Sequence, residues 1–345
     1  MKRLPYVGSL LLFLLCLTPI ALGQSYTVTD LGTLPGDDVS AGSAINASGR
    51  LVGGAESSVP HGFFWSTSQG LLDLPPLRGG IFSVAAGIDV GSVIAGTSTN
   101  RQGSDHAVLW INGKIRDLGT LPGGSVSLAN AINDAGQVAG GSNSGGTDTH
   151  AFLWSQTLGM QDLGTLIGPG GYSVAQSINR YGEIVGQSTV GPGGQTHGFV
   201  WTKGHGLKDL GTLSGGANSI AYAVNNLGQI VGGSDSPTSS FLAVLWTPAG
   251  KIQDLGTLAN ATGSSANGIN NSGQVVGYAI FPNIAYHAFV WTQTAGMQDL
   301  NALIAGNSGW TLEFAFAIND SGQITGRGSI NGQEHAYLLT PVGAN

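Results

Sequence analysis

The sequence predicts an all-β fold, a seven-bladed β-propeller with four antiparallel strands per blade. Three observations predict it: a motif that recurs seven times, four short strand candidates within each repeat, and an unusual composition. The chain has 58 Gly among 345 residues and only 9% charged residues, whereas soluble domains average about 7% Gly and about 25% charged residues. This composition excludes coiled coils, and a net charge of -7 excludes an ordinary nucleic-acid binder, which needs a basic surplus.

The repeat is defined by an Asp-Leu-x-x-Leu motif with steps of 43 to 47 residues. Two further motifs keep the same spacing, Ile/Val-Asn-x-x-Gly and His-Ala/Gly-aromatic/Val-x-Trp. The first motif begins at Asp30, Asp73, Asp117, Asp162, Asp209, Asp254 and Asp299, and the second at Ile45, Ile132, Ile178, Val224, Ile269 and Ile318, with a shortened form at Ile88. A period of this length with four strands per repeat is typical of a propeller.

Each repeat contains strand candidates that we name A, B, C and D. In one repeat they span residues 127–132, 137–142, 150–155 and 160–166. Asn133 and Gly136 stand at the first and fourth positions of a type I turn between A and B. The nearly constant spacing from the motif His to the next Asp indicates a tight C–D hairpin. Both faces of strand C are mostly apolar, which favours sheets packed face to face over a one-sided sheet or a β-solenoid, the competing repeat fold.

The two ends of the chain complement each other. A C strand at 335–339 has no D strand after it, and residues 26–31 read as a D strand with no C strand before it. We therefore expect the N-terminal strand to complete the last blade as its outer strand, which leaves no free sheet edge. Residues 24–345 are then a single domain.

Residues 1–23 read as a secretory signal peptide. Lys2 and Arg3 precede an apolar run at 10–17, and Ala21-Leu22-Gly23 forms a small-x-small cleavage signal. The one cysteine, Cys16, lies inside it, so the exported chain would have no disulfide. No second apolar run reaches about 18 residues. We expect a secreted, periplasmic or extracellular monomer without a membrane anchor.

The three motifs together resemble the bacterial HAF repeat family, named for residues seen here as His150-Ala151-Phe152 and His287-Ala288-Phe289. The resemblance covers residues 26–340 and implies an extracellular repeat protein. It implies no agreed activity and no catalytic residues.

The repeated side chains are interpreted as structural. One His per blade is too widely spaced around a ring to share a metal ion, so each is expected to hydrogen-bond within its own blade, and the motif Trp residues are expected to pack between blades. These residues are His61, His106, His150, His197, His287 and His335, with Trp65, Trp110, Trp154, Trp201, Trp246 and Trp291. The repeated Asn residues are expected to form turns, with a polar ring at the channel mouth as the alternative.

Function is expected where the repeats differ, in the D–A and B–C loops, which lie on one face. This face should be acidic and the opposite turn face basic. The last repeat has a four-residue insertion near Trp310, the one Trp outside the motif. The candidate ligand-binding residues are Trp310, Glu313, Tyr278, Phe281, Tyr286, Asp38, Asp105, Asp148 and Glu334. No catalytic residue is assigned, no cofactor is expected apart from a possible Ca²⁺, and metal ligands stay unknown.

Three functions remain open at this stage. The first is a secreted non-enzymatic binding module whose ligand is an extracellular polysaccharide or a cell-surface component. The second is a polysaccharide hydrolase or lyase that uses carboxylates on the same face, although no Gly-x-Ser-x-Gly elbow or metal-spaced His pair is present. The third is a structural envelope or matrix component that docks through the basic turn face. The sequence favours the first function and a protein that is not an enzyme.

Overall fold

The structure is a computed structural model, and it describes residues 25–56, 59–145, 148–191, 193–237, 239–283 and 285–343. The predicted signal peptide lies outside these residues. Within them, no helix is both long and apolar enough to cross a membrane.

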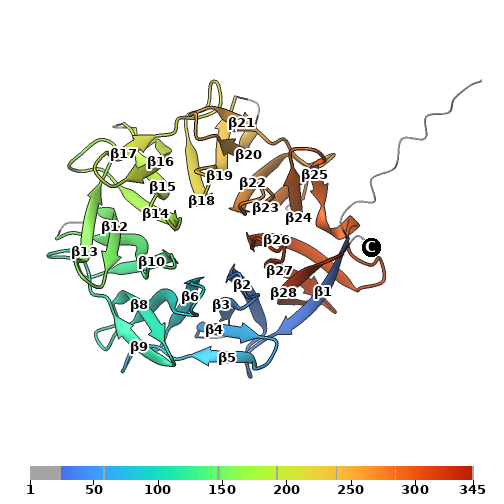
Figure 1. Cartoon of the computed structure of the whole chain (residues 1–345), viewed down its shortest axis with the longest axis horizontal. Helices are drawn as coiled ribbons and strands as arrows, with labels where there is room; N and C mark the ends of the chain where they lie inside the picture. Colours follow the sequence, from blue (N-terminus) through green and yellow to red (C-terminus); the bar gives the residue numbers. More distant parts are fainter. Residues whose placement is uncertain are drawn as a thin grey trace, which may run out of the picture.

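The fold is all-β, with β-strands arranged in sheets around a central opening (Figure 1). Five sheets have four strands each, in sequence order. The first consists of β6(Ser83–Ile88), β7(Ile94–Thr99), β8(Asp105–Ile111) and β9(Lys114–Asp117), and the second of β10(Ser127–Ile132), β11(Val138–Asn143), β12(Thr149–Ser155) and β13(Gly159–Gly164). The third consists of β14(Ser173–Ile178), β15(Ile184–Thr189), β16(Thr196–Thr202) and β17(Gly206–Asp209), and the fourth of β18(Ser219–Val224), β19(Ile230–Ser236), β20(Ser239–Trp246) and β21(Ile252–Asp254). The fifth consists of β22(Gly263–Ile269), β23(Val275–Phe281), β24(Ala285–Thr292) and β25(Gly296–Asp299).

The remaining sheet has eight strands and combines both ends of the chain. Its strands are β1(Ser25–Gly32), β2(Val39–Ile45), β3(Leu51–Glu56), β4(His61–Ser66), β5(Gly70–Leu74), β26(Trp310–Ile318), β27(Ile324–Ile330) and β28(Gln333–Val342). One parallel bridge, Val39 to Glu334, joins β2 to β28; all other pairings are antiparallel. A 3-10 turn, η1(Leu300–Ala302), follows β25.

The sheets stand radially, which is the arrangement of a β-propeller (Figure 1). In each four-stranded sheet the first strand is innermost and the last outermost, and in the eight-stranded sheet β2 and β26 are innermost. The predicted strands agree with β10 to β13 to within two residues. The N-terminal strand β1 pairs antiparallel with β28, from Ser25 opposite Val342 to Gly32 opposite Ala336. The prediction that this strand would pair with the last C strand is confirmed.

Every innermost strand carries a β-bulge, and the repeated glycines explain how it fits. In β10 the register shifts between Ala129 and Ala131, so Asn130 has no partner on β11. Opposite the bulge, a Cβ on Gly140 would lie 1.9 Å from the carbonyl oxygen of Leu128. Equivalent contacts occur at Gly53, Gly96, Gly186, Gly232, Gly277 and Gly326. One glycine in each repeat therefore serves this position, because a side chain there would clash with the facing backbone.

The core lies between neighbouring sheets. Trp154 and Val138 pack in one buried cluster with Leu109 and Ala95 of the preceding sheet. Since each sheet is covered on both faces, few strand positions reach solvent. The chain therefore needs few charged residues.

Candidate functional site

The motif histidines each contact the Asp of the neighbouring outer strand. The His Nδ1 to Asp carboxylate oxygen distance is 2.7 to 3.1 Å in six pairs. The pairs are His61–Asp73, His106–Asp117, His150–Asp162, His197–Asp209, His287–Asp299 and His335–Asp30. Because each pair joins strands C and D of one repeat, it fastens the outer strand rather than building a shared site.

On the loop face, a group of side chains that we call the Glu313 cluster gathers around the last two repeats. It consists of Glu313, Phe314, Arg327, Glu334, Tyr278 and Tyr286. Glu313 and Phe314 belong to β26, several residues before Asn319, which follows the strand at the opposite face. At about 3.3 Å per residue, the cluster lies roughly 20 Å from that turn.

Three charged groups of this cluster interact. Nη1 of Arg327 lies 2.9 Å from a carboxylate oxygen of Glu334. Burial raises the pKa of Glu313, and the charge of Glu334 raises it further, while Arg327 and a hydrogen bond from Ser329 act in the opposite direction. Among the described residues, the buried Nε of Arg327 has no hydrogen-bond partner. The site therefore combines a carboxyl group that resists ionisation with a second one that is ion-paired.

Three aromatic rings belong to the Glu313 cluster and lie in contact with one another. The ring centroids of Tyr278 and Tyr286 are 5.7 Å apart, and that of Phe314 lies 5.1 Å and 4.7 Å from them. The guanidinium carbon of Arg327 lies 4.9 Å from the centroid of Phe314, within cation–π range. Phe314 also stacks on Phe316 at 5.9 Å, and Phe316 lines a cavity of about 250 Å³ in the central channel. The cluster thus continues into the channel.

Irregularities in the last repeat create this cluster. A second bulge in β26, between Leu312 and Phe314, sets Glu313 apart from the regular pairing with β27. Ser329 on β27 stands opposite Glu334 on β28. Strands β26 and β28 have nine and ten residues, against six or seven for most strands of the same type. Both carboxyl groups nevertheless lie within the paired part of the sheet, since Leu312 and Phe314 on either side of Glu313 pair with β27, and Glu334 pairs with Ser329.

The nine candidates from the sequence are divided by the structure. Four of them, Glu313, Glu334, Tyr278 and Tyr286, belong to the cluster. Phe281 lies next to it, with its ring 4.7 Å from that of His287. Trp310 packs instead against the buried ring of Tyr337, with centroids 6.0 Å apart.

Asp38, Asp105 and Asp148 lie in or beside β2, β8 and β12, in three different sheets. The structure does not bring these three carboxylates together. Arg327 and Phe314 were not among the candidates. Phe314 has no motif to mark it, and the partnership of Arg327 with Glu334 depends on strand register.

A second polar site surrounds the channel on the turn face, where the repeated Asn residues form a ring. The side-chain amide of each Asn donates to the backbone carbonyl of the equivalent residue in the next repeat, at 3.0 to 3.1 Å. The donors are Asn46, Asn133, Asn179, Asn225, Asn270 and Asn319. The seventh position is Asp89, whose buried carboxyl group has a raised pKa because of desolvation, with a further contribution from Asp134. Asp89 has no amide donor, so the ring lacks one bond.

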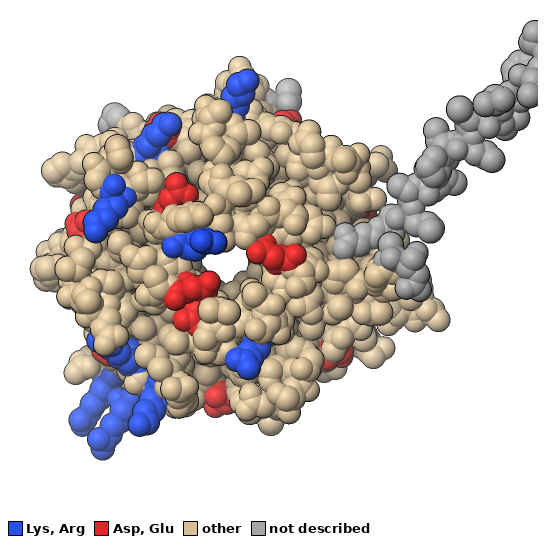
Figure 2. Space-filling model, viewed as in Figure 1, with Lys and Arg blue, Asp and Glu red and all other residues tan. Residues whose placement is uncertain are grey.

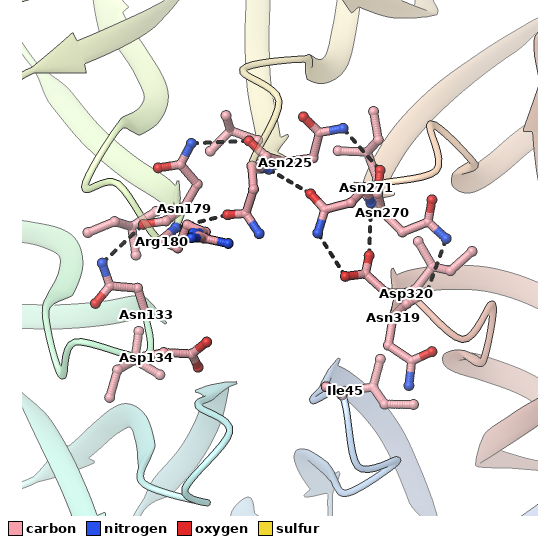
Figure 3. A pocket seen from close by; sticks show the side chains of 17 residues that line it. Ile45, Asn133, Asp134, Asn179, Arg180, Asn225, Asn270, Asn271, Asn319 and Asp320 are labelled. Carbon is pink, nitrogen blue, oxygen red and sulfur yellow. Dashed lines mark hydrogen bonds between the residues drawn. The ribbon is translucent and has the colours of Figure 1, made fainter.

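The residue after each ring position differs among the repeats and includes the charged groups of the mouth. Figure 2 shows basic and acidic side chains around the central opening. Asp134, Arg180 and Asp320, with Asn226 and Asn271, line a cavity of about 220 Å³ there (Figure 3). The mouth of the turn face is therefore mixed in charge, although the sequence predicted a basic face.

Within the described parts of the chain, no group of three or more His, Cys, Asp or Glu side chains is arranged to hold a metal ion.

No family model matches the chain, and no curated protein matches it. Similar solved structures include a prolyl endopeptidase (TM-score 0.56, 10% identity, 92% of this chain and 51% of that chain) and puromycin hydrolase (0.52, 12%, 88% and 51%). TolB from Acinetobacter baumannii is also similar (0.50, 11%, 85% and 63%). The chain thus spans between half and two thirds of the length of these proteins. At these identities the likeness concerns the fold.

The comparison corrects two expectations from the sequence, that the chain is a non-enzymatic binding module and that it is not an enzyme. Two of the structures named above are enzymes, a prolyl endopeptidase and a hydrolase. Solved structures of this fold therefore include enzymes, so the absence of catalytic sequence motifs and the rigid repeat scaffold do not exclude catalysis.

Proposed function

We propose that this protein is a hydrolase that cleaves glycosidic bonds of a polysaccharide at the Glu313 cluster. The observation that carries the proposal is the pairing of two unlike carboxyl groups, Glu313 with a raised pKa and Glu334 in an ion pair. Pairs of carboxyl groups whose environments differ in this way divide the roles of acid and base.

Glu313 is the proton donor in this scheme. A carboxyl group that stays protonated to a higher pH can protonate the glycosidic oxygen as the bond to the sugar breaks. Glu334 is the second carboxylate, which activates water or attacks the anomeric carbon. Arg327 orients Glu334 through the 2.9 Å ion pair.

The spacing of the strands is compatible with this chemistry. Glu313 and Glu334 lie on β26 and β28, which are separated by β27. Two strand spacings amount to about 10 Å between backbones, and the two carboxyl groups are close enough for one charge to raise the pKa of the other. Glycosidases need carboxyl separations of about 5 to 9.5 Å, a range that two glutamate side chains on such strands can reach.

A sugar ring is the substrate unit that fits the neighbouring aromatic rings. Tyr278, Tyr286 and Phe314 are partly exposed, and aromatic faces stack on the apolar face of a sugar ring while the tyrosine hydroxyls bond to its hydroxyls. The hydrolase named among the similar structures supports only the compatibility of the fold with hydrolysis.

The test measures reducing ends released from a panel of neutral, acidic and amino polysaccharides. Glu313→Gln and Glu334→Gln should each lower the rate at least about a hundredfold, the lower end of a general acid–base contribution. Asp148→Asn, an exposed carboxylate of another sheet, is the matched control and should leave the rate unchanged. Release that survives both glutamine substitutions would overturn the assignment.

We also propose the finer features that the sequence predicts for the fold and its location. The eight-stranded sheet is interpreted as two blades, which gives a seven-bladed propeller, since in the described part of the chain a single parallel bridge joins its two halves. We propose that the chain belongs to the HAF repeat family, because its three repeated motifs resemble those of that family. We also propose that residues 1–23 act as a signal peptide that directs export. Cleavage before Gln24, measured on protein recovered from outside the cytoplasm, would test the export.

A further inference from the structure

The channel mouth on the turn face contains an asymmetric set of charges. In six of the seven repeats the ring residue is Asn, whereas the residue that follows it is Ala47, Val90, Asp134, Arg180, Asn226, Asn271 or Asp320. Variation at one position, beside a nearly constant neighbour, means that the ring supports the scaffold and the next residue is free to serve a ligand.

Hydrogen bonds hold several of these side chains in place. Oδ1 of Asp134 accepts from the backbone N–H of Val90 at 3.0 Å. Both carboxylate oxygens of Asp320 accept from Asn271, one from its backbone N–H at 2.9 Å and one from its amide at 2.7 Å. The two carboxylates are thus oriented before any ligand binds, which lowers the entropic cost of binding.

Of the described residues that line the mouth, Arg180 is the one with a positive charge. Its guanidinium carbon lies 4.8 Å from the ring centroid of Tyr181, and among the described residues it forms no ion pair. Figure 3 shows Arg180 and Asp134 on neighbouring turns and Asp320 on the other side of the opening. The guanidinium is therefore available to a carboxylate.

We propose that this mouth binds a free basic α-amino acid. The α-carboxylate pairs with Arg180, and the α-ammonium group, attached to the same carbon, pairs with Asp134 on the neighbouring turn. The side-chain cation reaches Asp320 across the opening. Two carboxylates and one guanidinium leave the mouth one negative charge, which matches the single positive charge of such a ligand.

The wall of the cavity fits the remainder of this ligand. Part of the wall is formed by apolar side chains at the ends of the innermost strands, among them Ile45, Ile132 and Ile318. The methylene groups of a lysine or arginine side chain can pack on this surface while both ends stay polar. The volume of about 220 Å³ is that of a small ligand rather than of a polymer, and the site lies on the face opposite the Glu313 cluster.

The experiment is titration calorimetry of the whole chain with L-lysine and L-arginine. Cadaverine, which lacks the carboxylate, and norleucine, which lacks the distal cation, should bind at least tenfold more weakly, because each leaves one charged group of the mouth unpaired. Arg180→Gln and Asp320→Asn should each weaken lysine binding about tenfold or more. Lys203→Gln, on a C–D hairpin, is the control and should have no effect.

Three results would overturn the proposal: absence of lysine and arginine binding up to millimolar concentration, equal binding of cadaverine, or unchanged binding by both mouth variants. Folding of each variant is checked by its unfolding midpoint. The proposal is independent of the hydrolase assignment, because Glu313→Gln should lower the rate of hydrolysis at least about a hundredfold and leave lysine binding intact.

Discussion

Replacing Asp89 by Asn should complete the ring of amide hydrogen bonds around the channel. In the other repeats, Oδ1 of the ring Asn accepts from the backbone of the turn and its amide donates to the next repeat, as in Asn133 to Asn179. Asp89 makes the first kind of contact, since Oδ1 accepts from Val93 at 2.7 Å, but a carboxylate cannot make the second. The Asp89→Asn variant keeps the hydrogen bond from the backbone N–H of Val93 and adds a hydrogen bond from its side-chain amide to the backbone carbonyl oxygen of Asn133.

The added hydrogen bond determines how much Asp89→Asn should raise the free energy of unfolding. One buried neutral hydrogen bond contributes about 0.5 to 1.5 kcal/mol to the free energy of unfolding. An entropy of unfolding of about 2.1 cal/mol/K per residue, over roughly 320 residues, means that 1 kcal/mol raises Tm by about 1.5 °C. Asp89→Asn should therefore raise Tm by about 1 to 2 °C and shift the urea midpoint upward with the m-value unchanged.

The gain in stability from Asp89→Asn should also depend on pH, and the raised pKa of Asp89 determines whether this gain grows or shrinks as pH rises. The pKa of Asp89 in the folded protein is raised from 3.8, so the folded state holds this proton more tightly than the unfolded state. The contribution of Asp89 is most favourable below pH 3.8 and declines as pH rises to the folded pKa. Asn does not titrate, so the advantage of the variant grows across this interval and is constant above it.

Urea unfolding of both proteins at several pH values from about 4 to 7 measures this difference. Asp134→Asn provides a control, because it removes the neighbouring charge that contributes to the raised pKa of Asp89 and should reduce the pH dependence without completing the ring. If Asp89→Asn is less stable than the parent at neutral pH, or if its advantage is the same at every pH, the reasoning is refuted.

Three further changes test other parts of the structure. Gly186→Ala should cost about 1 to 3 kcal/mol, because the new Cβ would meet the carbonyl oxygen of Val174 at 1.9 Å, whereas Gly306→Ala, with open space around it, should be nearly neutral in the same urea experiment. Tyr26→Phe should stabilise by about 1 kcal/mol, because the buried hydroxyl has no partner among the described residues; a loss of stability would show that the hydroxyl is bonded. Hydrolysis should decline as pH rises through the raised pKa of Glu313, and a rate that increases there would exclude Glu313 as the acid.

The sequence could predict the repeating architecture because the physics is local and occurs in every copy. Turn residues such as Asn133 and Gly136 bound strands of fixed length, and the mismatch between the two ends of the chain implied the pairing of β1 with β28, which is observed. The His–Asp spacing likewise follows from one hairpin. The turn residues and the His–Asp spacing recur in several copies of the repeat, so each of these two inferences rests on more than one segment of the sequence.

The candidate site could be predicted only in part, because it arises where the repeat is broken. Glu313 and Glu334 could be assigned to one face, but their interaction depends on the second bulge in β26 and on the register of β27. The four-residue insertion near Trp310 marks the segment in which the bulge occurs, but it does not reveal the bulge or the register. The turn face was predicted to be basic from a count of charges, which does not reveal that Asp134 and Asp320 stand at the channel mouth while many basic residues lie elsewhere.

The pairing of β1 with β28 has a consequence for how the protein loses its structure. An open array of repeats can unravel from either end, one repeat at a time. Here both ends of the chain are held in one sheet by seven residue pairs between its first and last strands, so separation of this seam must precede any unravelling. The lifetime of the folded state is then limited by the rate at which the seam opens, and weakening it should speed unfolding far more than it slows folding.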